Sequence, residues 1–391
     1  MFDVTCPFCY HRTNRLRPWF ACSGLAAPGF PSCSKKPDPV RQRETGDDEP
    51  MYSVFPPPRL WLPSPRRAYC PDCNGRTGQR VCAKCHSPLP ANFGGSFSPV
   101  IAVVGARSTG KTVYLIVVAQ HLRTVVRARF RATVSLFPDA AYQTHQTNVE
   151  AIFEKGSLPA LTEQRDGRSE PLVFEWRRRR RIFSRYHSSY LSFLDTAGES
   201  LGTLTGVQEL KFLAGVDSFI VVLDPFTLPG ARDRLSLPKG APTAESNAYE
   251  VLAQVTEVIR KAEGTGSGAR IKKPIAVAFA KIDALKGVLG DGHPIFAAES
   301  TDPWVDNAAG RAVHESVREM LLDWEAGNID DHMQANYSNY QYFAVSSLGR
   351  PPDYEHYAVA EGGVQPLRVA DPVIWLLSVY KLVPRRRGRG R

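Results

Sequence analysis

A glycine-rich segment at residues 105–112 reads G-A-R-S-T-G-K-T and matches the pattern G-x-x-x-x-G-K-[ST]. An apolar stretch, Val100–Val104, precedes it, and an apolar helix is expected over Lys111–Arg123. The glycines let successive backbone N–H groups point into the turn without Cβ clashes, and the helix N-terminus adds the positive end of its dipole. A strand, a loop and a helix in this order therefore predict a loop that binds the phosphates of a nucleoside triphosphate.

The residues of this loop are expected to divide between phosphate and metal binding. Lys111 would reach the β- and γ-phosphates, and the hydroxyl of Thr112 would ligate Mg²⁺. Asp195 ends the apolar strand Tyr190–Leu194 and could hold Mg²⁺ through water. The N–H of Gly198 could bond the γ-phosphate and sense its loss. The other residues expected around the phosphates are Gly105, Ser108, Thr109 and Gly110.

From Pro99 onward, apolar runs alternate with amphipathic stretches, a pattern typical of a mostly parallel sheet with helices on both faces. We expect an α/β P-loop NTPase fold of three layers over residues 99–383. The expected strands are Val100–Val104, Phe130–Phe137, Leu172–Trp176, Tyr190–Leu194, Ser218–Leu223, Ile275–Ala280 and Tyr342–Val345. The expected helices are Lys111–Arg123, Asp139–Lys155, Ala244–Glu263, Ala308–Ala326 and Pro372–Leu382.

Three later motifs resemble those of the TRAFAC-class GTPases. The segment Asp195–Glu199 reads D-T-A-G-E and resembles the switch II motif of that class. The segment Ala280–Asp283 reads A-K-I-D and stands where the class carries N/T-K-x-D for guanine. Val345–Ser347 follows the last strand, where the class has its S-A-x loop against the base. The resemblance covers Val100–Leu382 and implies GTP and GDP as ligands, with Mg²⁺.

The resemblance also implies roles for single residues at the base. Asp283 would accept hydrogen bonds from the guanine N1 and N2 groups, Lys281 would lie along the base plane, and Ser346 would stand in the loop beside the base. Position 280 departs from the pattern, because alanine cannot supply the side-chain amide that braces the phosphate loop. Weaker guanine selectivity is expected, and an adenine-binding variant stays open.

Two further residues are expected at the reacting phosphate. Thr162 is the candidate for the switch threonine that contacts Mg²⁺, with an ordinary loop threonine as the alternative. Glu199 stands where many relatives place the glutamine that orients the attacking water. A carboxylate there adds negative charge beside a transition state already rich in it, so we expect slow GTP hydrolysis that depends on a partner supplying an arginine.

All eight cysteines lie before residue 90 and mark a separate N-terminal unit, a small zinc-ribbon segment. We divide it into a first cluster at 1–33, a proline-rich connector at 34–67 and a zinc ribbon at 68–90. Two C-x-x-C knuckles close together predict one four-thiolate Zn²⁺ site, formed by Cys70, Cys73, Cys82 and Cys85. A second site is expected from Cys6, Cys9, Cys22 and Cys33, with His11 and His86 as alternative ligands. Two zinc ions are expected, and disulfides or free thiols are the alternative.

The formal charge of +10 is concentrated in arginine runs at Arg177–Arg181 and in a basic tail, 384–391, that we expect to be disordered. Such runs could meet nucleic acid, acidic lipid head groups or an acidic protein face, or could be solvated. No apolar run approaches the ~20 residues of a membrane span, and the N-terminus lacks the pattern of a secretory signal. A cytoplasmic protein is expected.

The zinc knuckles, the D-T-A-G-E motif and the ending Pro366–Leu377 together resemble the bacterial double-GTPase 2 family. That resemblance implies a regulatory GTPase that works beside other components of multi-protein, conflict or defence systems, with no defined downstream partner. We expect a regulatory protein partner, either another GTPase chain or a GTPase-activating protein. Two alternatives stay open: a nucleic-acid-binding zinc protein with a regulatory nucleotide domain, and a nucleotide-binding scaffold without turnover.

Overall fold

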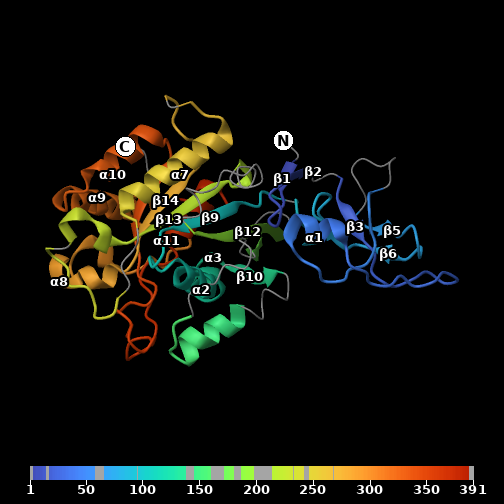
Figure 1. The fold of residues 1–391 in the computed structure, drawn as a ribbon, viewed down its shortest axis with the longest axis horizontal. Helices are drawn as coiled ribbons and strands as arrows, with labels where there is room; N and C mark the ends of the chain where they lie inside the picture. The colour runs from blue at the N-terminus through green and yellow to red at the C-terminus, as the bar shows by residue number, and fades with distance from the viewer. Residues whose placement is uncertain are drawn as a thin grey trace.

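The structure is a computed structural model that describes residues 3–14, 17–57, 66–94, 96–137, 145–159, 171–179, 186–197, 214–231, 233–241, 246–266 and 268–386. Figure 1 shows a large α/β body and a smaller N-terminal part, drawn in blue, at one side of it. No helix within these residues is both long enough and apolar enough to cross a membrane.

The described part of the body is built on a seven-stranded mixed sheet. Its strands, in spatial order, are β10 (Ala132–Phe137), β11 (Leu172–Arg179), β12 (Tyr186–Ala197), β9 (Val100–Gly105), β13 (Ser218–Leu223), β14 (Ile275–Phe279) and β15 (Tyr340–Ala344). The pairs from β12 to β15 are parallel, whereas β10 and β11 pair antiparallel with each other and β11 pairs antiparallel with β12. The carboxyl ends of the five parallel strands therefore share one edge of the sheet.

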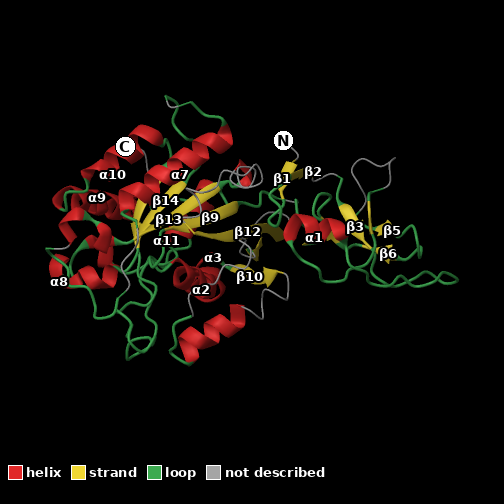
Figure 2. Cartoon of the chain, viewed as in Figure 1, coloured by secondary structure: helices red, strands yellow, loops and turns green. Residues whose placement is uncertain are grey.

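Helices cover both faces of this sheet, as the alternation of the sequence predicts (Figure 2). One face packs against α7 (Ala248–Glu263), α9 (Asn307–Asp323) and α10 (Gly327–Asn336), and the other against α2 (Lys111–His121), α3 (Arg127–Phe130) and α11 (Asp371–Val379). Successive side chains of β9 alternate between the two cores, since Ala102 lies in the first and Val103 in the second. Burial of these apolar surfaces is the main force that holds the layers together.

The helices differ from the sequence-based expectation mainly at their ends. The helix expected over Lys111–Arg123 ends at His121 and continues as a π-helical turn, η1 (Leu122–Val126). Helix α7 begins at Ala248, because Asn247 and Glu250 form a capping box there. Of the helix expected over Asp139–Lys155, residues 145–154 are helical and 139–144 lie outside the described residues. The shorter helical segments are η2 (Glu150–Glu154), η3 (Pro225–Thr227), η4 (Pro229–Ala231), η5 (Ile282–Leu285), α8 (Lys286–Leu289) and η6 (Pro294–Phe296).

The N-terminal part consists of short strands joined by knuckles. They are β1 (Asp3–Thr5), β2 (Arg12–Asn14), β3 (Trp19–Ala21), β4 (Val54–Phe55), β5 (Ala68–Tyr69), β6 (Arg76–Thr77), β7 (Arg80–Val81) and β8 (Pro88–Leu89). Strand β3 pairs with both β4 and β7, so segments far apart in the sequence form one small sheet. The stretch 34–67, expected to be an extended connector, contains β4 and a helix, α1 (Pro39–Thr45), which Asp38 caps.

At the other end, part of the tail expected to be disordered has defined contacts. Arg385 donates to the Ser378 hydroxyl at 3.0 Å, and Arg386 lies 3.8 Å from Asp306. Residues 387–391 lie outside the described residues.

Candidate nucleotide site and metal centres

The predicted phosphate loop lies at the carboxyl end of β9, between that strand and α2. A Cβ atom on Gly105 would lie 2.4 Å from the carbonyl oxygen of Val222 in the neighbouring strand, so only glycine fits there. Gly110 has φ +89° and Ser108 has φ +63°, which turns the chain sharply before the helix begins at Lys111. The loop therefore ends at the first turn of α2, whose backbone N–H groups have no partner within the helix and can bind an anion.

Lys111 and Thr109 are held inside this turn. The Lys111 ammonium donates to the carbonyl oxygens of Gly105 and Ala106 at 2.6 and 2.7 Å, and the residue is only 9% exposed. The Thr109 hydroxyl donates to the Ala106 carbonyl oxygen at 2.9 Å. A nearly buried ammonium group beside the N–H groups of a helix N-terminus is a set of donors that fits a polyphosphate.

Lys281 links the predicted phosphate loop to Asp224, which directly follows β13. Its ammonium donates to the Ser108 carbonyl oxygen at 2.9 Å and to Oδ2 of Asp224 at 2.7 Å. The Asp224 side chain is 3% exposed, and its Oδ1 accepts from the N–H of Phe226 at 3.0 Å. The Lys281 backbone has φ +55°, a left-handed conformation that non-glycine residues rarely adopt.

Asp283 and Ser346 meet beside Lys281. The Ser346 hydroxyl donates to Oδ1 of Asp283 at 2.5 Å and accepts from the N–H of Gly349 at 2.8 Å. Burial raises the pKa of Asp283 above its ordinary value, and the Ser346 hydrogen bond counteracts part of that rise. A half-buried carboxylate held in this way can accept from neighbouring N–H donors, which is what recognition of a guanine edge needs.

Ala280 lies between these groups, and its side chain offers no polar atom. Its backbone N–H donates to the Leu223 carbonyl oxygen at 2.9 Å, and the residue is buried. Tyr354 is a further neighbour that the sequence did not indicate: burial, followed by the carboxylates of Asp224 and Asp283, raises the pKa of its phenol to about 12.

The remaining predicted nucleotide residues are only partly described. Asp195 lies on β12 opposite Val103 of β9, which places its backbone one strand from the phosphate loop. Thr112 occupies the first turn of α2. Thr162, Gly198 and Glu199 lie outside the described residues, as does the side chain of Asp195.

Asp224, like Tyr354, is a residue of this site that the sequence analysis did not identify. It follows the fully buried strand β13 directly, as Asp195 follows an apolar run, and a proline stops the strand after it. That signal, a carboxylate at the end of a parallel strand, was available in the sequence. Its partner was not, because the contact with Lys281 depends on the pairing of β13 with β14.

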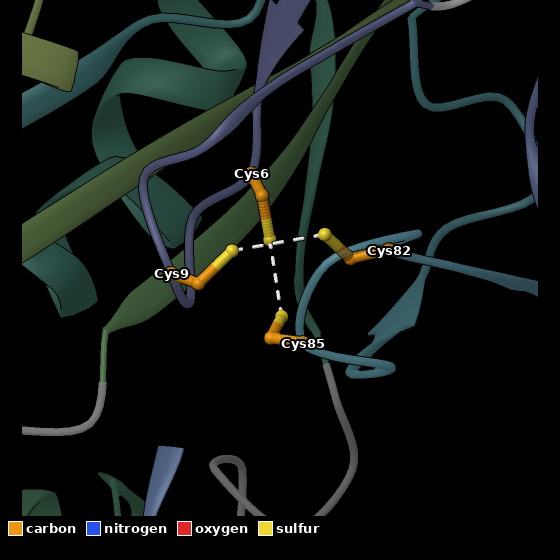
Figure 3. A group of neighbouring side chains, drawn as sticks. All are labelled: Cys6, Cys9, Cys82 and Cys85. Atoms are coloured by element: carbon orange, nitrogen blue, oxygen red, sulfur yellow. Dashed lines mark hydrogen bonds between the residues drawn. The ribbon is translucent and has the colours of Figure 1, made fainter. Parts of the chain in front are cut away.

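The eight cysteines form two groups of four, but not the two groups predicted. Cys6, Cys9, Cys82 and Cys85 form the first centre (Figure 3), and Cys22, Cys33, Cys70 and Cys73 form the second. The expectation that Cys70, Cys73, Cys82 and Cys85 share one ion is therefore wrong. Each knuckle instead meets cysteines from the start of the chain, because β3 pairs with β7 and draws the two halves together. His11 and His86 belong to neither group, and His86 pairs with Asp38 at 2.8 Å.

Both groups have the spacing of a tetrahedral zinc site. Zn–S bonds of about 2.3 Å place sulfur ligands about 3.8 Å apart. The Sγ atoms of Cys6 and Cys85 lie 3.8 Å apart and those of Cys9 and Cys82 3.7 Å apart. In the second centre the separations are 3.5 Å for Cys22 and Cys73 and 3.9 Å for Cys33 and Cys70. All eight cysteines are free, so the groups fit two Zn²⁺ ions and not disulfides.

The pKa values of two thiols in the first centre shift in opposite directions. Burial raises the pKa of Cys6, whereas the hydrogen bond from Cys6 lowers the pKa of Cys82. A bound cation would replace the shared protons and favour the thiolate form of all four groups.

The two centres differ in what surrounds them. The first is packed against the main sheet, because its cysteines share an apolar cluster with Val173 of β11 and Tyr190 of β12. The cluster around the second contains residues of the N-terminal part, such as Phe20 and Phe55. The first knuckle also meets the residues that precede β13, where a Cβ atom on Gly215 would lie 2.7 Å from the Tyr10 carbonyl oxygen.

Comparison with known proteins finds a relative that matches over most of both chains. No protein-family profile matches the chain. Over 361 residues the chain is 24% identical to a putative ESX-1 scaffolding and assembly protein, SaeC, of Mycolicibacterium smegmatis, covering 85% of this chain and 88% of the relative.

Two solved structures match the chain with low TM-scores. One is LeoA, a bacterial dynamin GTPase from ETEC, with 12% identity, 75% of this chain covered and a TM-score of 0.29. The chain spans 40% of the length of LeoA. The other is the signal recognition particle receptor SRb-GTP/SRX complex from Chaetomium thermophilum, with 13% identity, coverage of 67% of this chain and 96% of that one, and a TM-score of 0.26.

Proposed function

We propose that the protein is a GTP-binding regulatory protein whose main domain is a TRAFAC-type GTPase and whose N-terminal part is held by two zinc ions. The observation that supports it is the convergence of three elements: the phosphate loop, Lys281 on its Ser108 carbonyl oxygen, and Asp283 on the Ser346 hydroxyl. The loop would hold the phosphates, Lys281 would lie along the base, and Asp283 would accept from guanine N1 and N2.

Hydrolysis belongs to the same proposal. Thr112 and Asp195 would hold Mg²⁺, which neutralises charge on the phosphates when bound. Thr162 and Gly198 would contact the metal and the γ-phosphate, and Glu199 would face the attacking water. Because Glu199 adds a negative charge there, turnover would be slow and would depend on a partner that contributes a cation.

The regulatory output would be assembly of other proteins. The relative SaeC carries the description of a scaffolding and assembly protein, and the matched region spans most of both chains. A nucleotide-dependent scaffold therefore unites the GTP site with the zinc-bound N-terminal part. Membership of the double-GTPase 2 family, as the D-T-A-G-E motif suggests, remains part of this proposal.

The test is direct measurement of nucleotide binding by the full chain in Mg²⁺ and Zn²⁺. We expect GTP and GDP to bind more tightly than ATP, as measured by titration calorimetry. Lys111→Ala should weaken all three nucleotides, whereas Asp283→Ala should remove the preference for guanine, because it leaves the base donors unpaired. An unchanged preference in Asp283→Ala would show that the base site lies elsewhere.

Two surface variants serve as matched controls. Lys272→Ala and Asp291→Ala remove the same charges from exposed positions and should bind as the native protein does. Failure of the native protein to bind any guanine nucleotide would overturn the proposal as a whole. Single-turnover GTP cleavage that is fast without a partner would overturn only its hydrolytic part.

A further inference from the structure

Position 280 lacks the side-chain amide that would brace a phosphate loop of this kind, yet the loop is braced. Ser108, at the tip of the turn, is held through its carbonyl oxygen by Lys281. A flexible lysine stem cannot fix a loop by one hydrogen bond, because its rotamer freedom opposes the contact. A second anchor on the ammonium is therefore needed.

Asp224 supplies that anchor. Its Oδ2 lies 2.7 Å from the Lys281 ammonium, and the carboxylate is almost fully buried, so the pair is weakly screened. Its other oxygen accepts from the Phe226 N–H, and the Thr227 hydroxyl donates to the Asp224 carbonyl oxygen at 2.7 Å. The Phe226 bond holds the carboxylate itself and the Thr227 bond holds the Asp224 backbone, so the carboxylate is positioned independently of Lys281.

The geometry points to Asp224 as a positioning residue for nucleotide binding: it locks Lys281 onto Ser108 and so replaces, from the neighbouring strand, the brace that Ala280 cannot provide. This inference rests on the proposed function. The role of Asp224 differs from the proposed role of Asp283 because its removal should lower the affinity for all nucleotides and not only for guanine nucleotides. Asp224 acts on the phosphate loop, which every nucleoside triphosphate uses, whereas Asp283 acts on the base.

The lock is tested with Asp224→Asn, which keeps an acceptor for the Phe226 N–H and removes the charge. We expect affinity for GTP and for ATP to fall together, by about tenfold or more, with their ratio unchanged. Asp233→Asn is the matched control, because Asp233 is exposed and lies on the same connection between β13 and α7. It should change neither the affinity for GTP nor the affinity for ATP. Lys281→Met removes the other partner, and the double variant should lose little more than either single variant.

The outcomes separate the two proposals. If the native protein binds GTP and Asp224→Asn binds GTP and ATP as tightly, the lock is wrong and the proposed function stands. A selective loss of GTP would make Asp224 a base-specificity residue and would also refute the lock. If Asp224→Asn does not fold, Lys281→Met decides: unchanged affinity for both nucleotides would refute the lock. No guanine nucleotide binding by native protein would overturn the proposed function itself.

Discussion

The hydroxyl of Ser346 donates a 2.5 Å hydrogen bond to the carboxylate of Asp283. Because the same hydroxyl accepts from the Gly349 N–H, it cannot rotate away without losing two partners. The orientation of the Asp283 carboxylate is therefore set by a residue that follows a different strand, β15.

Ser346→Ala should lower guanine preference without affecting phosphate binding. Loss of one hydrogen bond to a charged group corresponds to about a tenfold decrease in GTP affinity, with ATP affinity unchanged. The measurement is competition between GTP and ATP for the full chain. Ser347→Ala, one residue further along, is the control, and equal behaviour of the two variants would contradict the role given to Ser346.

GTP affinity should rise with pH across the acidic range. Burial raises the pKa of Asp283 above the value of 3.8 for an ordinary aspartate, and guanine donors require the ionised form. GTP binding therefore releases protons below the raised pKa, and the dependence levels off above it. The stability of the unliganded protein should change in the opposite direction. Ionising the buried Asp283 carboxylate is unfavourable in the folded state, so the free energy of unfolding should fall as pH rises through this window. Calorimetry between about pH 4 and pH 7 in two buffers checks this, and Asp283→Asn should remove the part of the dependence that GTP shows and ATP does not.

Loss of the two metal centres should have unequal effects. Cys82→Ser removes a ligand of the centre packed on β11 and β12, so we expect the whole chain to lose at least about 2 kcal/mol of unfolding free energy and to bind GTP less tightly. Cys73→Ser affects the centre surrounded by N-terminal residues and should leave GTP affinity unchanged. Native mass spectrometry should find two zinc ions in the native protein and one in each variant. Equal losses of GTP affinity would contradict this difference.

Gly215→Ala should weaken the docking of the first knuckle on the sheet. The added Cβ atom would approach the Tyr10 carbonyl oxygen to 2.7 Å, a backbone contact that cannot move alone. We expect a loss of about 1–3 kcal/mol in urea unfolding and faster zinc release to a chelator. Gly268→Ala, which meets no atom within 4 Å, is the matched control. Identical zinc release from the two variants would show that the knuckle does not depend on this contact.

Much of the fold could be predicted because it depends on short-range patterns. The phosphate loop and the strands from Val100 to Ala344 follow from apolar runs and glycine turns, and the structure places strands in all seven expected regions. The convergence of Lys281 and Asp283 with the loop follows from parallel strands that end at one edge.

The grouping of the cysteines could not be predicted, because proximity in sequence favours the wrong partners. Cys73 and Cys82 are close along the chain but lie in different centres, since the pairing of Trp19 with Val81 decides which knuckles meet. Such pairings are set by long-range packing. The Asp224–Lys281 contact was missed for the same reason.

The grouping of the cysteines constrains the order in which the two metal centres can form during synthesis of the chain. The second centre joins Cys22 to Cys73 across 51 positions, and it lies nested inside the first, which joins Cys6 to Cys85 across 79. A chain emerging from the ribosome can complete the inner centre while the outer one still lacks two ligands. Closing a longer loop costs more entropy. Formation of the inner centre shortens the free chain between Cys6 and Cys85, so it lowers the entropic cost of forming the outer centre. Removal of the first nine residues would delete Cys6 and Cys9, and Cys82 and Cys85 would then keep only half of the ligands of their centre.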